Sequence, residues 1–436
     1  MNGRRQKPSS QKDDSMTDRP KGATRRGFLK TGLAGSAAAL VAGVARAEGP
    51  DPLIIDVQPW AQGLGDGVDA TPYGLPIRFE GHVVRRNVDW LTADVVSSIN
   101  FTPIHALEGT ITPQGCAFER HHSGAIELAK PDYRLMVNGL ADQPLVFTYA
   151  DLERFPRTVR TFFCECAANG GMEWGGAQLQ GAQFTHGMIH NMEYTGVSLR
   201  TILNEAGVRP EGTWVYVEGA DASSNGRSIP MEKALDDCLV AFYANGEALR
   251  KEHGYPVRLV VPGWEGNLWV KWLRRIEVTD GPTESREETS KYTDLMPDGR
   301  ARKWTWAMDA KSVVTSPSPQ APWRQGPGPM VITGLAWTGR GRIAKVDVSL
   351  DGGRNWQEAR LAGDPQPMAL TRFYLDHVWD GSEMLLQSRA TDETGYVQPT
   401  KDALRAIRGL NSVYHNNGIQ TWWVKPNGEA ENVEVS

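Results

Sequence analysis

Residues 161–170 read Thr-Phe-Phe-Cys-Glu-Cys-Ala-Ala-Asn-Gly, and this segment decides how the first half of the chain is organised. An apolar, β-prone run is followed by Ala-Ala-Asn-Gly-Gly, which predicts a strand that enters a tight turn. A thiolate at the end of such a strand is a soft ligand that suits a transition metal. Cys166 is therefore a candidate metal ligand, although the local pattern alone favours Cys164 and Cys166 as small buried strand residues.

The N-terminus has the features of a twin-arginine export signal. Thr24-Arg-Arg-Gly-Phe-Leu-Lys30 fills the motif, an apolar segment covers residues 33–44, and Ala45-Arg-Ala47 offers a cleavage site. The apolar segment is shorter than the roughly 20 residues that cross a bilayer, so we expect no membrane anchor. We predict a signal peptide at 1–47 and a periplasmic mature chain; an uncleaved signal is the alternative. Proteins that use this route are exported folded, often with a cofactor, which favours Cys166 as a metal ligand.

The charge of the chain argues against two classes of partner. The sequence has 47 Lys and Arg and 52 Asp and Glu; residues 1–47 hold 10 basic and 3 acidic residues, so the remainder has 37 and 49, a net charge of −12. Nucleic acid and anionic membranes are therefore poor candidate partners. An acidic surface suits a basic protein partner, but solubility explains it more simply.

The four cysteines are compatible with an oxidising compartment. A disulfide between Cys116 and Cys238 is possible there. One between Cys164 and Cys166 would be strained, because residues two apart in a strand lie roughly 6.5–7 Å from each other.

The C-terminal part of the chain has an all-β pattern. A segment rich in Pro, Gly and Ser at 316–329 marks a break in composition. Strands are predicted at 330–337, 343–350 and 384–390, with a hairpin turn at Asp351-Gly-Gly353. Short strands at this spacing indicate an immunoglobulin-like sandwich.

The preceding part mixes strands and helices, which indicates an α+β domain. Strands are predicted at 135–137, 214–218 and 257–261; an amphipathic helix at 199–206 ends at Gly207, and 231–244 has another helical pattern. The charged segment 285–302 is interpreted as a surface connection. We predict a first domain at 48–303 and a second domain at 304–436.

Several motifs occur in the same order as in one known family. They are Phe118-Glu-Arg-His-His122, Cys166-Ala-Ala-Asn169, Glu218-Gly-Ala-Asp221, His253-Gly-Tyr-Pro-Val-Arg258 and Val270-Lys-Trp272. On these motifs the chain resembles the sulfite oxidase family of molybdenum enzymes over nearly all of residues 75–425. Any one motif would be weak evidence, but the ordered set is highly specific.

Within this family the chain is most similar to the molybdenum subunits of sulfane dehydrogenases, the SoxC group. The residues that carry this similarity are Phe118–His122, Gln183-Phe-Thr-His-Gly-Met-Ile-His190 and Pro262-Gly-Trp-Glu-Gly-Asn-Leu-Trp-Val-Lys271. The resemblance implies a molybdopterin domain followed by a dimerisation domain of immunoglobulin-like fold, and therefore a homodimer. It also implies a molybdenum-molybdopterin cofactor.

The resemblance also implies roles for individual residues. Cys166 would be the metal ligand and a catalytic residue, with Arg120 near the metal. His253, Arg258 and Lys271 would bind the pterin phosphate. The remaining cofactor-binding candidates are Phe118, Glu119, His121, His122, Asp221 for the pterin amino groups, and the main chain of Trp269 and Val270.

The chain departs from sulfite oxidases at four positions. Asn225 stands where the family has a catalytic tyrosine, before Gly-Arg-Ser-Ile-Pro230. Gly170 and Gly171 replace basic residues, and Ala168 replaces the glycine of the metal-ligand motif. A small dianion such as sulfite needs convergent positive charge, so these losses favour a bulkier, carrier-bound substrate. Arg120 and Arg227 remain as candidate anion contacts, and the glycines are expected to open space.

Other signals are weaker or absent. His186 and His190 have the i, i+4 spacing of a helical zinc site, but Gly187 stands in place of the catalytic glutamate. The sequence has no Cys-x-x-Cys-His haem attachment motif and no glycine-rich dinucleotide fingerprint. Electrons must therefore leave to a separate protein, for which the resemblance implies a c-type cytochrome subunit.

The leading functional hypothesis is oxygen-atom transfer from water to a sulfane sulfur on a sulfur-carrier protein. A sulfite:cytochrome c dehydrogenase is the alternative within the same family. A non-catalytic secreted binding protein is the alternative from another class.

Overall fold

The Cys-x-Cys segment lies at the end of strand β5 (Thr158–Glu165), with Cys166 just past it, at the edge of a five-stranded sheet. The strand order is β10 (Glu247–Ala248), β9 (Leu239–Ala244), β6 (Ile189–Ser198) and β5, and β11 (Arg258–Val260) also pairs with β9. The computed structural model describes residues 62, 75–88, 90–92 and 94–435. The predicted signal peptide lies outside the described residues.

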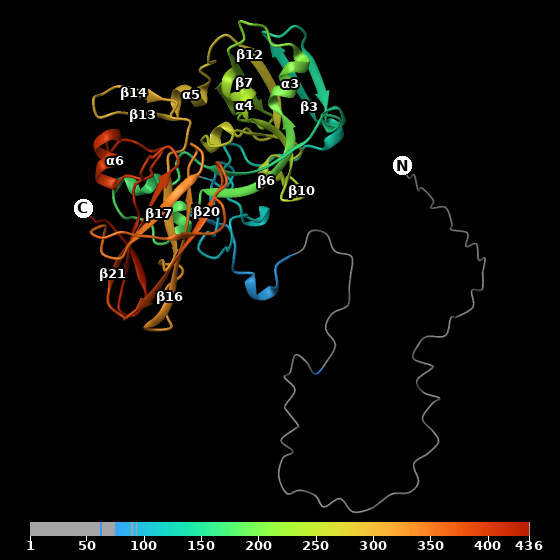
Figure 1. The fold of residues 1–436 in the computed structure, drawn as a ribbon. Helices are drawn as coiled ribbons and strands as arrows, with labels where there is room; N and C mark the ends of the chain where they lie inside the picture. The colour runs from blue at the N-terminus through green and yellow to red at the C-terminus, as the bar shows by residue number, and fades with distance from the viewer. Residues whose placement is uncertain (1–61, 63–74, 89, 93, 436) are drawn as a thin grey trace, which may run out of the picture. The chain divides into compact units, whose positions relative to one another are not determined.

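A second five-stranded sheet completes the first half of the chain (Figure 1). Its order is β4 (Leu145–Thr148), β3 (Arg134–Gly139), β12 (Leu273–Thr279), β7 (Trp214–Gly219) and β8 (Gly226–Pro230), with β3 and β12 parallel. Helix α3 (Leu199–Ala206) contacts strands of both sheets and ends at Gly207, as the sequence predicts. The strands predicted at 135–137, 214–218 and 257–261 coincide with β3, β7 and β11.

One helical prediction is wrong over half its length. Helix α4 ends at Asp236 (Met231–Asp236), and the chain then enters strand β9 at Leu239. The side chains of Leu239, Val240, Ala241 and Phe242 are all buried, so the strand is apolar on both faces and lacks the alternation that usually marks one.

Short elements connect these sheets. They are η2 (Arg78–Glu80), β1 (Arg86–Asn87), β2 (Asn100–Phe101), η3 (Gln114–Cys116), η4 (Lys130–Asp132), α1 (Tyr149–Glu153), η5 (Gly171–Gly175), α2 (Ala182–His186), η6 (Lys251–His253) and η7 (Gly266–Leu268).

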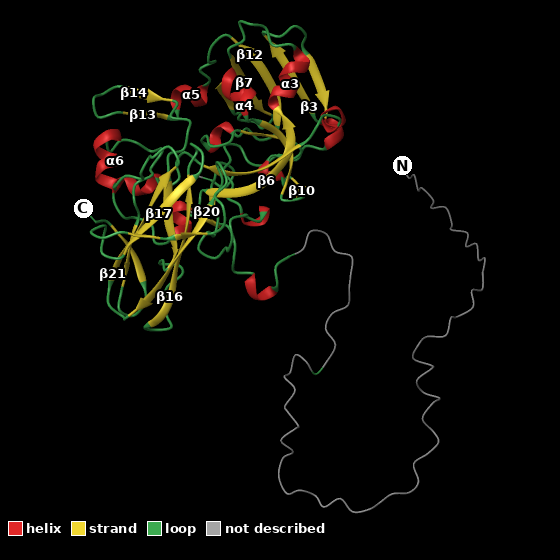
Figure 2. Cartoon of the chain, in the orientation of Figure 1, coloured by secondary structure: helices red, strands yellow, loops and turns green. Residues whose placement is uncertain are grey.

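The second half is a two-sheet sandwich, which agrees with the all-β prediction (Figure 2). One sheet has the order β15 (Lys311–Ser316), β16 (Gly328–Trp337), β20 (Thr371–Trp379), β19 (Arg360–Leu361). The other has the order β18 (Gln357–Glu358), β17 (Ile343–Ser349), β21 (Met384–Asp392), β22 (Thr421–Val424), β23 (Ala430–Val433). Side chains from both sheets share one core, and α6 (Lys401–Arg408) follows β21. The fold class is thus α+β with a second, all-β part.

The composition break at 316–329 is the loop between β15 and β16, so it lies inside the sandwich. The connection between the halves is instead the segment 285–310, which contains α5 (Arg286–Ser290) and the hairpin of β13 (Thr293–Leu295) and β14 (Ala301–Lys303). This segment is more than a surface connection, because Glu287 and Glu288 are buried in it.

Stacked tryptophans attach this connection to the first half. The ring of Trp306 lies parallel to those of Trp264 and Trp304, with centroids 4.8 and 5.6 Å away. Trp304 and Trp306 both have positive φ angles, 61° and 55°. A bulky residue keeps this conformation only where its surroundings enforce it. The stack therefore holds the residues that lead into β15.

All four cysteines are free, so the possible Cys116–Cys238 disulfide is not present. No helix among the described residues is long and apolar enough to cross a membrane.

Candidate active site

A pocket with about 740 Å³ of empty space, open solvent included, lies in the first half of the chain. Ten of the eleven predicted cofactor-binding residues line it, together with Cys166. The lining residues are Phe118, Glu119, Arg120, His121, His122, Cys164, Cys166, His190, Asp221, Asn225, Glu252, His253, Arg258, Gly266, Asn267, Trp269, Lys271, Trp272 and Tyr292.

The eleventh candidate, Val270, is buried beneath this lining. Its carbonyl accepts a hydrogen bond from the main chain of Leu259 at 2.8 Å, and its own main-chain nitrogen donates to Leu268. The carbonyl of the preceding residue, Trp269, accepts a hydrogen bond from Arg258 Nη2 at 3.0 Å. The main chain at 269–270 therefore holds the wall of the pocket.

Three cations face the pocket without a carboxylate partner. Among the described residues, Arg120, Arg258 and Lys271 form no ion pair. Lys271 Nζ donates to the carbonyls of Arg120 and Glu252, each at 3.0 Å, and contacts His121 Nδ1 at 2.9 Å. Burial, and then the charge of Arg258, lower the pKa of Lys271 to about 7. An anionic ligand would relieve this repulsion.

The histidines of the pocket are neutral at pH 7. Burial and nearby cations lower the pKa of His122 to about 4 and that of His121, His190 and His253 below their ordinary value. His253 Nε2 donates to the carbonyl of Gln114 at 3.2 Å. Neutral His253 therefore uses its one N–H for Gln114, and it offers a ligand an acceptor at Nδ1 but neither a donor nor a charge.

The pocket carboxylates have partners of their own. Glu119 accepts from His121 Nε2 at 2.8 Å; although burial acts against it, this bond and the charge of Arg85 lower the pKa of Glu119 to about 2. Glu252 pairs with Arg85 at 3.2 Å. Asp221 accepts hydrogen bonds from Ser123 Oγ at 3.0 Å and from Ser223.

Several buried polar atoms of the lining have no hydrogen-bond partner among the described residues. They are Arg120 Nη1, His190 Nδ1, Asn225 Oδ1, both side-chain polar atoms of Asn267, and Trp272 Nε1. Buried polar atoms are rarely left unpaired in folded proteins. Unpaired donors, unpaired cations and a thiol in one pocket fit a large, polar, anionic cofactor with a metal that binds sulfur.

Cys166 lies where β5 ends and its turn begins. Its main-chain nitrogen donates to Met188 at 3.0 Å, and its carbonyl accepts from Asn169 at 2.8 Å. Burial raises the pKa of its thiol, which a bound metal would oppose. Ala168 has no positive φ, so alanine fits where the family motif has glycine.

The second half of the chain fixes the strand and turn that carry Cys166. Glu165 points into the interface between the halves, where it pairs with Lys311 Nζ at 3.1 Å and accepts from Trp337 Nε1 at 2.7 Å. Asn169 Nδ2 donates to the same carboxylate at 2.9 Å, and Lys311 Nζ donates to the carbonyl of Asn169 at 2.9 Å. The residues before and after Cys166 are thus joined by one buried network.

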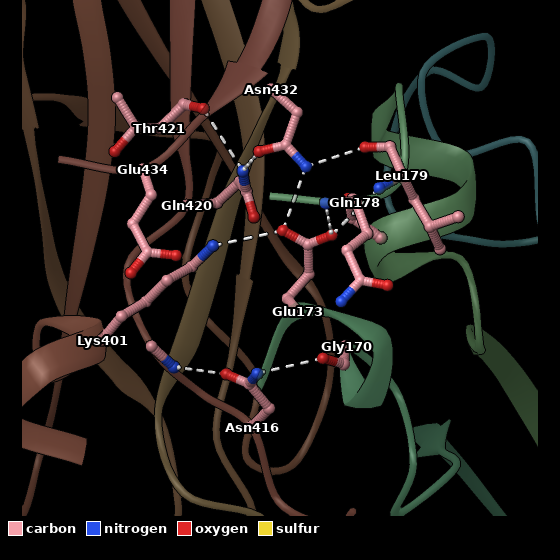
Figure 3. Close-up of polar contacts among 12 residues, drawn as sticks. Gly170, Glu173, Gln178, Leu179, Lys401, Asn416, Gln420, Thr421, Asn432 and Glu434 are labelled. Atoms are coloured by element: carbon pink, nitrogen blue, oxygen red, sulfur yellow. Dashed lines mark hydrogen bonds and ion pairs between the residues drawn. The ribbon is translucent and has the colours of Figure 1, made fainter. Parts of the chain in front are cut away.

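The turn after Asn169 is held in the same way (Figure 3). Lys401 Nζ and Asn432 Nδ2 bind Glu173 Oε2 at 3.2 and 3.0 Å. Asn416 Nδ2 donates to the carbonyl of Gly170 at 3.0 Å. Glu173 also accepts from the main chain of Gln178, which closes the loop around η5.

Gly170 and Gly171 do not open space, contrary to the expectation from the sequence. A Cβ on Gly171 would lie 2.7 Å from the carbonyl oxygen of Val413, and Gly170 has a φ of 85°. The main chain of His415 also donates to Ala167 at 2.7 Å. Val413 and Asn416 of the segment 412–417 therefore close the space beside the two glycines.

Arg227 does not line the pocket. Its side chain is 0% exposed and pairs with Glu265 at 3.2 Å, which in turn binds His415 Nε2 at 2.9 Å. Among the two candidate anion contacts, the structure brings Arg120 to the pocket and places Arg227 behind it.

Sequence reasoning missed several lining residues. Asn267 and Trp272 lie inside motifs that carried the family resemblance, so those motifs could have indicated them. Tyr292 lies in no motif, and its segment has the composition of a surface connection. Cys164 lines the pocket as a buried thiol whose pKa is raised to about 12, mainly by burial.

The weak zinc signal has no structural counterpart. His186 ends α2, whereas His190 lies in β6, so the two are not on one helix. Among the described residues no group of three or more His, Cys, Asp and Glu side chains could hold a metal ion.

Two family models match the chain. The model of the oxidoreductase molybdopterin binding domain matches residues 122–287, and that of the Mo-co oxidoreductase dimerisation domain matches residues 302–422. Sulfite oxidase from Gallus gallus is 35% identical over 333 residues, which are 70% of this chain and 71% of that protein. The chain belongs to the sulfite oxidase family of molybdopterin oxidoreductases.

Two further proteins are similar to this chain. Mitochondrial sulfite oxidase from Homo sapiens is 32% identical over 71% of this chain and 61% of its own length. The solved structure of the sulfane dehydrogenase SoxCD from Paracoccus pantotrophus matches with 76% identity and a TM-score of 0.87, over 89% of this chain and 100% of the matched chain. The cofactor of this oxidoreductase is molybdenum-molybdopterin, which supplies an oxygen-atom-transfer centre that accepts two electrons.

Proposed function

We propose that the protein oxidises a sulfane sulfur that is bound to a sulfur-carrier protein. The observation that carries this proposal is the pocket wall, where Asn225 stands in place of the tyrosine. Outside the lining, Val413 and Asn416 close the space beside Gly171 and Gly170, which stand in place of the basic pair. A small free dianion would find fewer cations here than in a sulfite oxidase. The solved relative with 76% identity, a sulfane dehydrogenase, supports the same reading.

Each oxidation step takes one oxygen atom from water to sulfur. It releases two protons to solvent and two electrons, which a c-type cytochrome subunit accepts. A carrier protein would position its sulfur through contacts outside the pocket, so remote binding energy would supply the orientation.

The residues of the pocket have separate proposed roles. Cys166 provides the thiolate for molybdenum, and Arg120 binds the oxyanion near the metal. Arg258 and Lys271 bind the pterin phosphate as cations. Neutral His253 lies beside them and orients Arg258, whose Nη1 donates to the carbonyl of His253. Asp221 accepts hydrogen bonds from the pterin amino groups, and the segment 118–122 with Trp269 and Val270 shapes the cavity.

The proposal includes export and assembly. Residues 1–47 direct folded, cofactor-loaded protein to the periplasm by the twin-arginine route. Residues 48–303 form the molybdopterin domain, and residues 304–436 form an immunoglobulin-like domain that makes the homodimer. Replacing Arg25 and Arg26 with lysine should retain molybdenum-loaded protein in the cytoplasm; normal delivery of this variant would refute the export signal.

A sulfite:cytochrome c dehydrogenase is the second candidate, because relatives of 32–35% identity are sulfite oxidases. The two are separated by steady-state kinetics with cytochrome c as electron acceptor. We expect high kcat/KM for a carrier loaded with sulfane sulfur and low kcat/KM for free sulfite. Efficient oxidation of free sulfite without any carrier would support the second candidate instead.

A further inference from the structure

Tyr292 brings a hydroxyl-bearing side chain into the pocket from a segment outside every family motif. It lines the pocket together with Cys166, Arg120 and Asn225. Its φ angle is 54°, in the left-handed region that bulky side chains rarely adopt. Strain of this kind persists only where neighbouring contacts enforce it, and it is concentrated at functional sites.

The segment before Tyr292 is attached to the strand that follows Asn225. Glu288, in α5, accepts hydrogen bonds from the main-chain nitrogen of Ser228 at 2.6 Å and from its Oγ at 3.1 Å. Ser285 Oγ donates to the carbonyl of Gly226 at 2.9 Å. Helix α5 is therefore fixed against β8, next to Asn225.

The segment after Tyr292 is attached to the second half of the chain. Asp294 is buried, pairs with Arg408 at 3.2 Å and accepts from Ser412 Oγ at 2.9 Å. Because Tyr292 stands between two anchored carboxylates, Glu288 and Asp294, its main chain has little freedom to relax from the strained conformation.

The ring of Tyr292 contacts two other side chains. The guanidinium carbon of Arg227 lies 4.6 Å from the ring centroid, and the ring of Tyr414 lies 5.0 Å away. Arg227 is itself fixed by Glu265. A buried Arg227 that is fixed by Glu265 can hold the Tyr292 ring through a cation–π contact. We therefore assign Arg227 the role of positioning Tyr292.

The hydroxyl of Tyr292 makes no hydrogen bond to another described residue, although the ring and the main chain are anchored. A phenol has an ordinary pKa of about 10, which is well above neutral pH. The phenol therefore keeps its proton and can donate a hydrogen bond.

We propose that Tyr292 donates this hydrogen bond to the oxygens of the sulfur group under oxidation, and so replaces the tyrosine that is absent at position 225. This inference rests on the proposed function in one respect, which is that a sulfur oxyanion must occupy the pocket. It makes Tyr292 a substrate-contacting residue, and Arg227 a positioning residue.

The test is Tyr292→Phe, which removes the hydroxyl and keeps the ring that contacts Arg227 and Tyr414. We expect kcat/KM per bound molybdenum to fall roughly 10- to 100-fold, as for the loss of a hydrogen bond to a charged group. Sulfate binding to the holoenzyme, measured by calorimetry, should weaken by about tenfold for the same reason. The molybdenum content should match that of the wild type.

The matched control is Tyr243→Phe, which removes a phenol hydroxyl on β9, outside the pocket lining, and should change neither quantity. A Tyr292→Phe enzyme with wild-type kcat/KM and wild-type sulfate affinity would overturn the inference. So would a variant that binds no molybdenum, because the hydroxyl would then serve the cofactor and not the substrate.

The kinetic arm is run with both carrier-bound sulfane and free sulfite. If the wild type prefers free sulfite, the proposed function fails, while a loss in Tyr292→Phe with sulfite still supports this inference. If the wild type prefers the carrier and Tyr292→Phe is unaffected, the proposed function stands and this inference fails.

Discussion

Glu165, the last residue of β5 and the one between Cys164 and Cys166, forms a buried ion pair with Lys311 of the opposite half of the chain at 3.1 Å. The two side chains are 0% and 2% exposed. Side chains alternate along a strand, so Glu165 faces away from its cysteine neighbours and toward the sandwich. The conformation at Cys166 thus depends on residues that lie about 150 positions later in the sequence.

We predict that Lys311→Met destabilises the protein by about 3–5 kcal/mol, because it leaves the Glu165 carboxylate buried without its cation. Chemical denaturation measures this loss, and the molybdenum content should fall with it. Lys345→Met removes the partly exposed pair with Asp347 and should cost about 1 kcal/mol or less. Equal effects of the two variants would contradict the prediction.

Cys166→Ser should abolish turnover and lower the molybdenum content, since a hydroxyl is a poor replacement for a soft thiolate. Cys164→Ser is the matched control, because it changes the neighbouring pocket thiol on the same strand and should keep most of the metal. Metal analysis of the two purified variants checks this. Comparable loss of molybdenum from both would mean that the two thiols act together.

In the cofactor-free protein, the contribution of Lys271 to the free energy of unfolding should increase as the pH rises from about 7 toward 10.5. The pKa of Lys271 is lowered to about 7 in the folded chain, so in this range the unfolded chain binds a proton that the folded chain does not. Lys271→Met should remove this part of the pH dependence. An anionic cofactor should also reduce the contribution of Lys271 to the pH dependence. Denaturation of the cofactor-loaded protein at several pH values measures this change.

Gly171→Ala should cost about 1–3 kcal/mol, because its Cβ would lie 2.7 Å from the carbonyl oxygen of Val413. Gly281→Ala is the control, since nothing lies within 4 Å of a Cβ there. Thermal denaturation of both variants gives the comparison. A neutral Gly171→Ala would mean that segment 412–417 can move away and that a basic side chain could be restored.

Asn225→Tyr should raise kcat/KM for free sulfite, because it adds a phenol to a pocket in which Asn225 Oδ1 has no partner among the described residues. The same substitution should lower kcat/KM for a carrier-bound substrate by filling space. If the ratio of kcat/KM for the two substrates does not change, position 225 does not determine substrate specificity.

The sequence by itself determined the family, the α+β class with a following β-sandwich, and ten of the cofactor-binding candidates that meet in one pocket. These features depend on local signals, namely hydrophobic periodicity, turn residues and ordered motifs, and such signals are readable along the chain. The strand at 239–244 escaped the same reasoning, since burial on both faces removes the period that separates strand from helix.

Only the tertiary structure decided which side chains complete the pocket and which stay behind it. Tyr292 enters from a polar segment because Glu288 and Asp294 anchor it at two distant places, and Arg227 leaves the pocket because Glu265 binds it. Residues 412–417 fill the space beside Gly171, which composition alone suggested was open. These outcomes depend on contacts between residues far apart in the sequence, and no local pattern records which distant partner a buried charge will find.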